Sequence, residues 1–243
     1  MPYCHTQALV LRRADYREHD RVLSLLTPHR GKVDVLARGC RKPKSPLLSC
    51  SELFALGDYV LYQGKGHEIV SACQVQESYY PLREDIRKLS YAAILLAAAD
   101  QAAQPEQEQE HLLILLTRSL HRLAYGDWDA KAVTAAFLLH FASLQGYKPR
   151  LKHCAVCERP LAPGEGAWLD PQAGGLVCRQ CPRSGAAMPL SGDTINWLSD
   201  VLALGIEKTG ASPQEAPVKE LKRYVEAVLD RRLPQLPDSV PGL

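Results

Sequence analysis

Two Cys-x-x-Cys pairs constrain the fold of this 243-residue chain more than any other feature. The first pair is Cys154 and Cys157, and the second, Cys178 and Cys181, follows after twenty intervening residues. A Cys-x-x-Cys segment forms a tight turn that directs both sulfurs at one ion, and two such turns complete the tetrahedron that structural Zn²⁺ prefers. We therefore predict one zinc ion held by four thiolates. Because this coordination leaves no position for water, the predicted site is structural and not catalytic.

The residues between the two pairs support a zinc ribbon. Short strands are predicted at 167–170 and 176–177, joined by a turn rich in proline and glycine at 171–175. The alternatives are simple reduced thiols or a redox dithiol, but a redox motif usually occurs once, next to a βαβ pattern that this sequence lacks. We predict a zinc-binding insertion at about 151–187.

The N-terminal third of the chain predicts a small β-barrel. Five β-rich segments follow one another with only turns and one long polar loop between them. An oligonucleotide-binding (OB) fold is the obvious five-stranded candidate, although another small barrel would show the same pattern. The predicted strands are 7–11, 21–26, 32–37, 58–62 and 68–72.

From about residue 82 the apolar residues recur at helical three- and four-residue steps. The predicted fold class is therefore α+β multidomain. A barrel domain occupies 1–80, and a helical domain at 81–243 carries the four-cysteine zinc-ribbon insertion. The proline-rich end, 234–241, is expected to fray. The predicted helices are 85–101, 106–125, 129–145, 192–208 and 218–233.

Charge is unevenly distributed along the chain. The formal net charge is +2, but the first 44 residues contain ten Lys or Arg and only four acids. Four of these cations lie in the segment 38–46, where Gly39, Pro43 and Pro46 disfavour regular structure. Taken alone, a charge run of this kind is usually a solvated, mobile loop. On the border of a predicted OB barrel it indicates a polyanionic partner.

Other features indicate a cytoplasmic protein. The first residues lack a basic region followed by an apolar one, and the most apolar stretch, 92–99, is far too short to span a membrane. The remaining cysteines, Cys4, Cys40, Cys50 and Cys73, have no ligand spacing and are expected to be reduced. We therefore expect no membrane partner.

Five segments, in the same order along nearly the whole chain, resemble those of a known family. They are 16–27, 31–32, 37–45, 79–85 and 174–181. On these segments the chain resembles the RecO recombination-mediator proteins of bacteria. Two small departures are Glu158, where the family often has glycine, and the pair His29 and Arg30 before Gly31.

The resemblance implies an N-terminal OB fold, a helical C-terminal domain and no catalytic centre. It implies binding of single- and double-stranded DNA, and annealing of complementary strands in gap and double-strand-break repair. The implied partners are RecR, the C-terminal tail of single-stranded DNA-binding protein (SSB) and, indirectly, RecA, in the bacterial cytoplasm at the nucleoid. The implied phosphate contacts are Lys32, Arg38, Arg41, Lys42 and Lys44, together with Arg12 and Arg13, of which only one is expected to face DNA because adjacent strand residues point to opposite faces.

Two further sets of side chains are candidates for binding. Tyr16, Tyr59 and Tyr62 can stack on bases. However, Tyr59 and Tyr62 lie on opposite faces of one strand, so at least one is expected in the core. The SSB tail is expected to bind an apolar pocket on the helical domain edged by cations such as Arg118, Arg122 or Lys131.

Three other functions stay open on the sequence alone, and one of them is a scaffold with no nucleic-acid role. A zinc-ribbon accessory factor of transcription or translation would bind RNA through the same barrel. A metal-dependent nuclease would need a carboxylate cluster for Mg²⁺. The acids Asp15, Glu18, Asp20 and Asp34 are instead interleaved with arginines, so we do not expect an enzyme.

Overall fold

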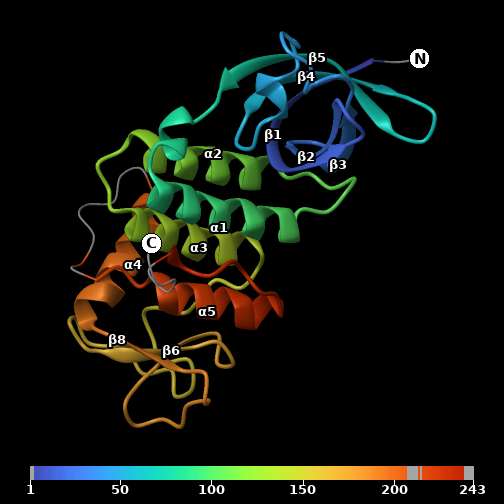
Figure 1. Ribbon diagram of the computed structural model, residues 1–243. Helices are drawn as coiled ribbons and strands as arrows, with labels where there is room; N and C mark the ends of the chain where they lie inside the picture. The colour runs from blue at the N-terminus through green and yellow to red at the C-terminus, as the bar shows by residue number, and fades with distance from the viewer. Residues whose placement is uncertain (1–2, 207–212, 214, 238–243) are drawn as a thin grey trace. The chain divides into compact units, whose positions relative to one another are not determined.

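The computed structural model describes residues 3–206, 213 and 215–237, which form two compact units (Figure 1). The first unit contains residues 3–81 and 96–114, and the second contains 82–95 and the described residues from 115 onward. Helices α1 (Ile86–Ala102) and α2 (Glu110–Tyr125) therefore contribute residues to both units.

The first unit is built around a closed five-stranded barrel, so the predicted barrel is confirmed. Its strand order is β1-β2-β3-β5-β4, in which β3 and β5 are parallel and the other neighbours are antiparallel. Each predicted strand is present and is longer than the sequence pattern indicated. The strands are β1 (Tyr3–Tyr16), β2 (Asp20–Thr27), β3 (Gly31–Ala37), β4 (Leu56–Gln63) and β5 (Glu68–Glu77).

A β-bulge divides β1 into two parts with different surroundings. Residues 8–11 are buried, Ala8 and Val10 of them in the barrel core, and the pairing register with β2 then shifts between Val10 and Arg12. Residues 12–16 are exposed and pair only with β2 in the barrel sheet. We call residues 12–24, which continue beyond the buried part of β1, the β1–β2 arm.

The segment 38–55 between β3 and β4 is tied to the barrel by apolar side chains and by backbone hydrogen bonds. Cys40 and Leu47 are buried members of the barrel core. The Val10 amide donates to the Ala55 carbonyl at 3.0 Å, and the Phe54 amide donates to the Val10 carbonyl at 3.3 Å. This segment, which includes the short 3₁₀ helix Ser49–Ser51, is therefore not the free loop that a charge run alone suggests.

Helix α3 (Ala130–Leu144) lies at the centre of the second unit. Ten of its residues are buried, as its nearly continuous apolar sequence predicts. It packs against α4 (Gly192–Leu204) and α5 (Val218–Leu229). Helix α4 begins after Ser191, whose hydroxyl accepts a hydrogen bond from the Thr194 amide, and it ends before Gly205. The prediction extended this helix to 208, and residues 207 and 208 lie outside the described residues.

A small antiparallel sheet lies between α3 and α4 in the chain, which confirms the predicted inserted hairpin. Its order is β7-β6-β8, with β6 (Ala167–Asp170), β7 (Gly175–Val177) and β8 (Met188–Leu190). The strand β8 was not predicted, because three residues around a proline give no strand signal. Pro189 is exposed in this edge strand, where proline is tolerated.

The proline-rich end of the chain was expected to fray. For residues 234–237 this expectation was wrong. Leu233 and Leu236 are buried, and the Leu233 amide donates to Glu226 Oε1 at 2.8 Å. The leucines between the prolines provide apolar surface that the composition alone did not reveal. Residues 238–243 lie outside the described part of the chain.

The connection between α1 and α2 packs directly on the β2–β3 turn. The Lys32 amide donates to the Gln104 carbonyl at 3.2 Å, and the Glu106 amide donates to the Arg30 carbonyl at 3.0 Å. These bonds keep residue 106 out of the helix, which explains why α2 begins at Glu110 and not at 106 as predicted. Gly31 has a φ of 63°, and a Cβ atom there would overlap the Gln104 carbonyl oxygen.

Replacing Gly31 with alanine is expected to destabilise the protein, because the added methyl group overlaps backbone atoms that are themselves hydrogen-bonded. The matched control is Gly39→Ala, since Gly39 has the same φ of 63° and only the flexible Lys42 side chain nearby, at 3.7 Å. Urea titrations should give a free energy of unfolding about 1–3 kcal/mol lower for Gly31→Ala than for Gly39→Ala. Equal stability of the two variants would contradict this close packing.

Candidate nucleic-acid interface and metal centre

The four predicted metal ligands come together in the inserted sheet. Their Sγ atoms all lie within 4.8 Å of one another, and the Sγ atoms of Cys157 and Cys178 are 4.0 Å apart. Bonds of about 2.3 Å to a central Zn²⁺ place the corners of a tetrahedron about 3.8 Å apart. The cluster therefore fits a single tetrahedral metal ion.

Each Cys-x-x-Cys pair is closed by its own backbone. The Glu158 amide donates to the Cys154 carbonyl at 2.9 Å, and the Cys181 amide donates to the Cys178 carbonyl at 3.4 Å. Glu158 has a φ of 61°, in the left-handed region that favours glycine. This conformation accounts for the glycine expected at that position from the family resemblance.

The thiols of the cluster differ in their pKa values. Burial raises the pKa of Cys154, but backbone N–H groups, those of Cys157 and Cys178 foremost, outweigh burial and lower this pKa to about 6. The hydrogen bond between Cys181 and Cys157, together with burial, raises the pKa of Cys181 to about 12. Because neighbouring thiolates repel one another, all four ionise together only when a metal ion compensates their charge.

Polar contacts order the loops around the cluster. Arg159 donates to both carboxylate oxygens of Glu165, at 3.1 and 2.6 Å, and this pairing lowers the pKa of Glu165 to about 2. Asp170 is not part of the metal cluster. Its carboxylate accepts hydrogen bonds from the amide and the hydroxyl of Ser184, both at 2.7 Å. The insertion is thus held by its own contacts.

The basic loop, residues 38–47, is hydrogen-bonded to the β1–β2 arm through its backbone. The Gly39 amide donates to Asp20 Oδ1 at 2.8 Å, and the Arg41 amide donates to the His19 carbonyl at 3.0 Å. Within the loop, the Lys42 amide donates to the Gly39 carbonyl at 3.1 Å, which forms a tight turn. The backbone that carries the predicted phosphate contacts is therefore fixed.

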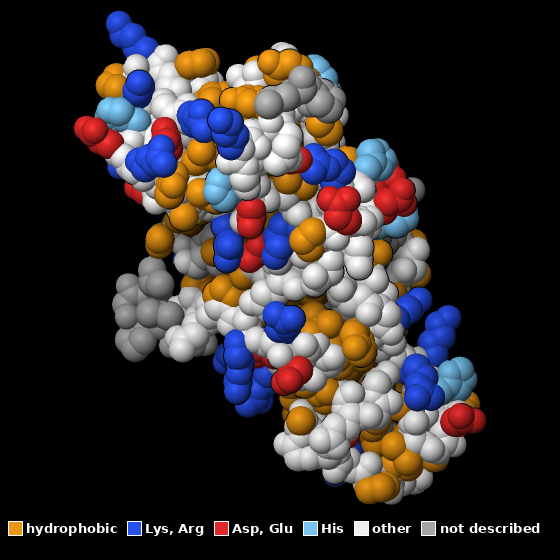
Figure 2. Space-filling view, turned by 90° about the vertical axis from the view of Figure 1, so that its right-hand side faces the viewer, with side chains coloured by type: hydrophobic (Ala, Val, Ile, Leu, Met, Phe, Trp, Pro, Cys, Tyr) orange, Lys and Arg blue, Asp and Glu red, His pale blue; other side chains and the backbone are white. Residues whose placement is uncertain are grey.

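All four cations of the basic loop are exposed on this backbone. They are Arg38, Arg41, Lys42 and Lys44. Figure 2 shows Lys and Arg side chains over the barrel, in the upper part of the view, with hydrophobic and acidic side chains between them. The barrel surface is therefore locally cationic and not uniformly so.

Two further predicted contacts belong to a network of arginines and acids. Arg13 pairs with Glu52, which also accepts from Arg21 at 2.8 Å. Arg21 in turn binds Asp15 at 3.1 Å, and Arg41 lies 3.4 Å from the same carboxylate. This chain of contacts links Arg13 to the basic loop, and it partly neutralises both Arg13 and Arg41.

The remaining two predicted contacts lie around a single acid of α1. The Lys32 Nζ donates to the carbonyl oxygen of Asp100 at 2.6 Å and to its Oδ1 at 3.3 Å, and Arg12 Nε lies 3.6 Å from Oδ2. The Lys32 side chain is only 25% exposed. Arg12 and Arg13 thus have different partners, as expected for adjacent residues of one strand. The structure does not bring Arg12 and Lys32 into the network of the basic loop.

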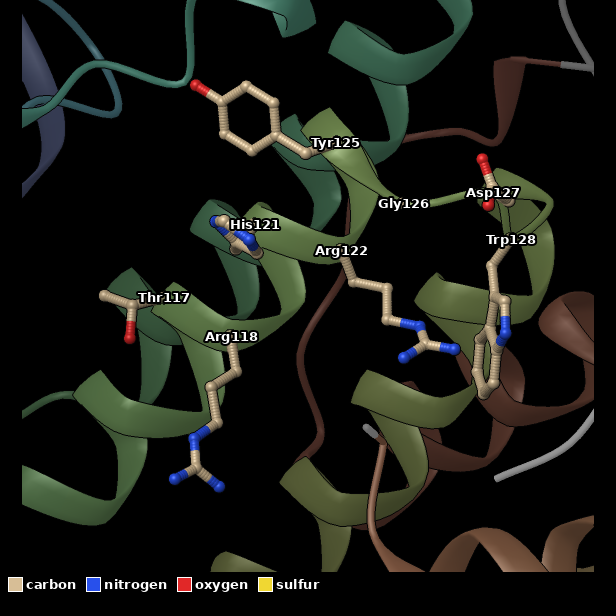
Figure 3. Close-up of a pocket in the computed structure, with 8 residues that line it drawn as sticks. All are labelled: Thr117, Arg118, His121, Arg122, Tyr125, Gly126, Asp127 and Trp128. Carbon is tan, nitrogen blue, oxygen red and sulfur yellow. The ribbon is translucent and has the colours of Figure 1, made fainter. Parts of the chain in front are cut away.

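A pocket of about 640 Å³ lies at the C-terminal end of α2 (Figure 3). Arg122 extends towards Trp128, and its guanidinium lies 3.9 Å from the ring centroid. The sequence indicated Arg118 and Arg122, but His121, Tyr125 and Trp128 were missed. His121 and Tyr125 follow Arg118 by three and seven residues on one face of α2, so helical spacing could have found them. Only the fold brings Trp128, which lies beyond Gly126, back over α2. The lining residues are Thr117, Arg118, His121, Arg122, Tyr125, Gly126, Asp127 and Trp128, and Lys131 is not among them.

A second hollow, of about 390 Å³, lies between α5 and the loop that precedes β8. Arg223, Arg231 and Arg232 line it together with Glu226 and Asp230, so its cations are offset by acids.

None of the helices in the described residues combines the length and the apolar character needed to cross a membrane.

Comparisons with known proteins divide the chain between the barrel strands and the helices. Family profiles described as Recombination protein O N terminal and Recombination protein O C terminal match residues 1–79 and 83–239. A protein from Moorella thermoacetica named DNA repair protein RecO is 36% identical over 175 residues, which are 72% of this chain and 65% of that protein. Proteins of the same name from Alkaliphilus metalliredigens and Rubrobacter xylanophilus are each 32% identical over 93% of this chain, and over 94% and 91% of their own lengths. With both profiles matched in order, this chain belongs to the RecO family of DNA repair proteins.

Proposed function

We propose that this protein is a DNA-binding recombination mediator that anneals complementary strands in the repair of gaps and double-strand breaks. In this role it acts on SSB-coated single-stranded DNA, and with RecR it promotes the loading of RecA. The observation that carries the proposal is the basic loop, in which Arg38, Lys42 and Lys44 are exposed on a backbone fixed to the β1–β2 arm. Cations held in this way contact phosphates without reading base sequence.

Arg13 and Arg41 form the flank of this surface. Their side chains are 34% and 35% exposed, so a phosphate can approach them although they are already paired. A phosphate oxygen replaces Asp15 or Glu52 as acceptor and forms charge-assisted hydrogen bonds of the same kind. Because Lys32 is largely buried at Asp100, we propose a smaller contribution from that residue.

Electrostatics supplies the physical basis of annealing. Two DNA strands repel each other, and a cationic surface that neutralises both lowers the free energy needed to bring them together. Each phosphate contact releases condensed counterions, so affinity for single strands falls with salt with a log–log slope of about −0.7 per contact. Binding is therefore expected to be tolerant of sequence and strongly dependent on salt.

The pocket at the end of α2 is the proposed site for the acidic C-terminal tail of SSB. Arg118 and Arg122 offer positive charge, while Trp128 and Tyr125 offer apolar surface beside it. An acidic peptide with an apolar residue is complementary to such a combination. This assignment replaces Lys131 of the sequence prediction with residues that line one pocket.

We further propose that the protein is not an enzyme and acts in the cytoplasm, at the nucleoid. The acids that a nuclease needs for Mg²⁺ are distributed among other partners. Asp15 binds Arg21 and Arg41, and Asp34 accepts a hydrogen bond from Ser24. A chromosomal substrate supports the proposed location.

Zinc is the metal that we propose for the four-cysteine cluster. Four thiolates are a soft ligand set, which selects Zn²⁺ over Mg²⁺ or Ca²⁺. Since all four positions of the tetrahedron are filled by protein, the ion closes the inserted sheet and has no chemical step to perform. In this proposal its role is to stabilise the second unit.

Loss of one metal ligand is expected to reduce stability more than DNA affinity. Cys154→Ser removes a ligand, whereas the control Cys4→Ser removes a thiol of β1 that is outside the cluster. Elemental mass spectrometry should find about one zinc ion per chain in the wild type and in Cys4→Ser, and far less in Cys154→Ser. The Tm of Cys154→Ser should fall by at least about 5 °C. Full zinc occupancy with an unchanged Tm would rule out the assignment.

Reversal of two charges on the basic loop is expected to abolish most DNA binding without unfolding the protein. In Arg38→Glu/Lys42→Glu two phosphate contacts are lost, so the magnitude of the salt slope on single strands should decrease by about 1.4. The control is Lys65→Glu, which reverses an exposed cation on the β4–β5 turn of the same barrel. Fluorescence anisotropy over a range of salt concentrations, with a strand-annealing assay, measures both effects.

Unchanged affinity of the double variant at low salt would contradict the proposed surface. Binding of structured RNA tighter than of single-stranded DNA, without annealing, would instead favour the accessory-factor alternative.

Truncation of the pocket arginines is expected to weaken binding of a peptide that corresponds to the SSB tail. Arg118→Ala and Arg122→Ala should each raise its Kd about ten-fold, because a hydrogen bond to a charged group is lost. Arg223→Ala in the second hollow is the matched control. Circular dichroism checks the fold, since Arg122 also packs on Trp128. A loss of affinity in Arg223→Ala alone would place the peptide in the other hollow.

A further inference from the structure

The tip of the β1–β2 arm presents an aromatic ring. Tyr16 is the last residue of β1, and it is 41% exposed. Arg17 follows with a φ of 55°, and its Cζ lies 5.1 Å from the centroid of the Tyr16 ring. A single exposed tyrosine is common on protein surfaces, so its exposure alone identifies no ligand. The contacts of its neighbours indicate the ligand.

The basic loop is attached to the residues on both sides of this ring. Arg41 Nη2 lies 3.4 Å from Asp15 Oδ2, and Arg41 Nη1 donates to the Arg17 carbonyl at 3.5 Å. The Arg41 amide donates to the His19 carbonyl at 3.0 Å. Residues 15, 17 and 19 thus all contact one residue of the loop, which places the loop beside the tip of the arm that carries Tyr16.

The other tyrosines that the sequence offered for stacking are engaged elsewhere. Tyr59 is 1% exposed, and its hydroxyl donates to the Cys50 carbonyl at 2.8 Å, so it belongs to the barrel core. The ring of Tyr62 lies 6.0 Å from that of Tyr3, the first residue of β1. Tyr3 and Tyr16 are therefore at opposite ends of a 14-residue strand.

We propose that Tyr16 stacks on an unpaired nucleobase while Arg17 and the basic loop bind the adjacent phosphates. The inference rests on the proposed DNA-binding function and adds a base-binding position to it. Because every base has an aromatic face, such stacking is tolerant of sequence. A base within a duplex is already stacked between its neighbours, so the position favours single strands.

This arrangement also suits annealing. A base that stacks on Tyr16 by its face keeps its hydrogen-bonding edge free, and a complementary base can pair with that edge. The phosphates are neutralised by the basic loop at the same time. The ring therefore presents one strand in a form that the second strand can recognise.

The test compares two probes of equal length, a labelled oligo(dT) strand and an oligomer of abasic units that has phosphates but no bases. Four proteins are measured by anisotropy: wild type, Tyr16→Ala, Tyr16→Phe and the control Tyr3→Ala, which removes an exposed ring at the other end of β1. Tyr16→Ala should bind oligo(dT) between about five-fold and a hundred-fold more weakly than wild type. Its affinity for the abasic oligomer should be unchanged, and Tyr16→Phe and Tyr3→Ala should match the wild type on both probes.

Two outcomes would overturn the proposal while leaving DNA binding by the basic loop intact. In the first, Tyr16→Ala binds oligo(dT) as tightly as the wild type. In the second, it loses the same factor on both probes, which would make Tyr16 a positioning residue for phosphate contacts. If the wild type binds neither probe, the proposed function itself fails, and the stacking position fails with it.

Discussion

Backbone hydrogen bonds between the basic loop and the β1–β2 arm turn a run of charges into a surface. Lysines and arginines close in sequence repel one another, and on a free loop they spread into solvent. Here the amides of Gly39 and Arg41 are bound to the arm, and Cys40 and Leu47 are buried on the other side of the loop. Burial of these apolar side chains offsets the repulsion, and the remaining features of the proposed interface depend on that anchorage.

Acids in the same region affect how tightly the proposed interface can bind a polyanion. Asp15 and Glu52 each bind two arginines, so the guanidinium groups are held in place before any polyanion arrives. Ordered arginines lose less conformational entropy on binding phosphate than free ones. The same acids compete with phosphate for the arginines, which limits affinity.

The sequence was sufficient for features that depend on neighbours along the chain. The spacing of Cys154, Cys157, Cys178 and Cys181 predicted one cluster, and the structure brings their sulfurs together. The barrel strands and the buried helix α3 followed from apolar patterns in the same way. Contacts between distant residues were not predictable. Nothing in the sequence indicates that Lys32 reaches Asp100 or that Arg13 reaches Glu52. Asp100 lies on α1 and Glu52 on the segment between β3 and β4, and only the fold brings these acids to the barrel strands. Strand alternation assigned one of Tyr59 and Tyr62 to the core, but only the fold shows that it is Tyr59.

The inserted sheet affects how much folded protein a cell can maintain. It separates α3 from α4 along the chain, yet these helices pack on each other, so the segment between them must close a long loop. If a metal ion holds that loop, chains made during zinc starvation fold less completely and are degraded faster by proteases. Repair capacity would then decline because less folded protein is present.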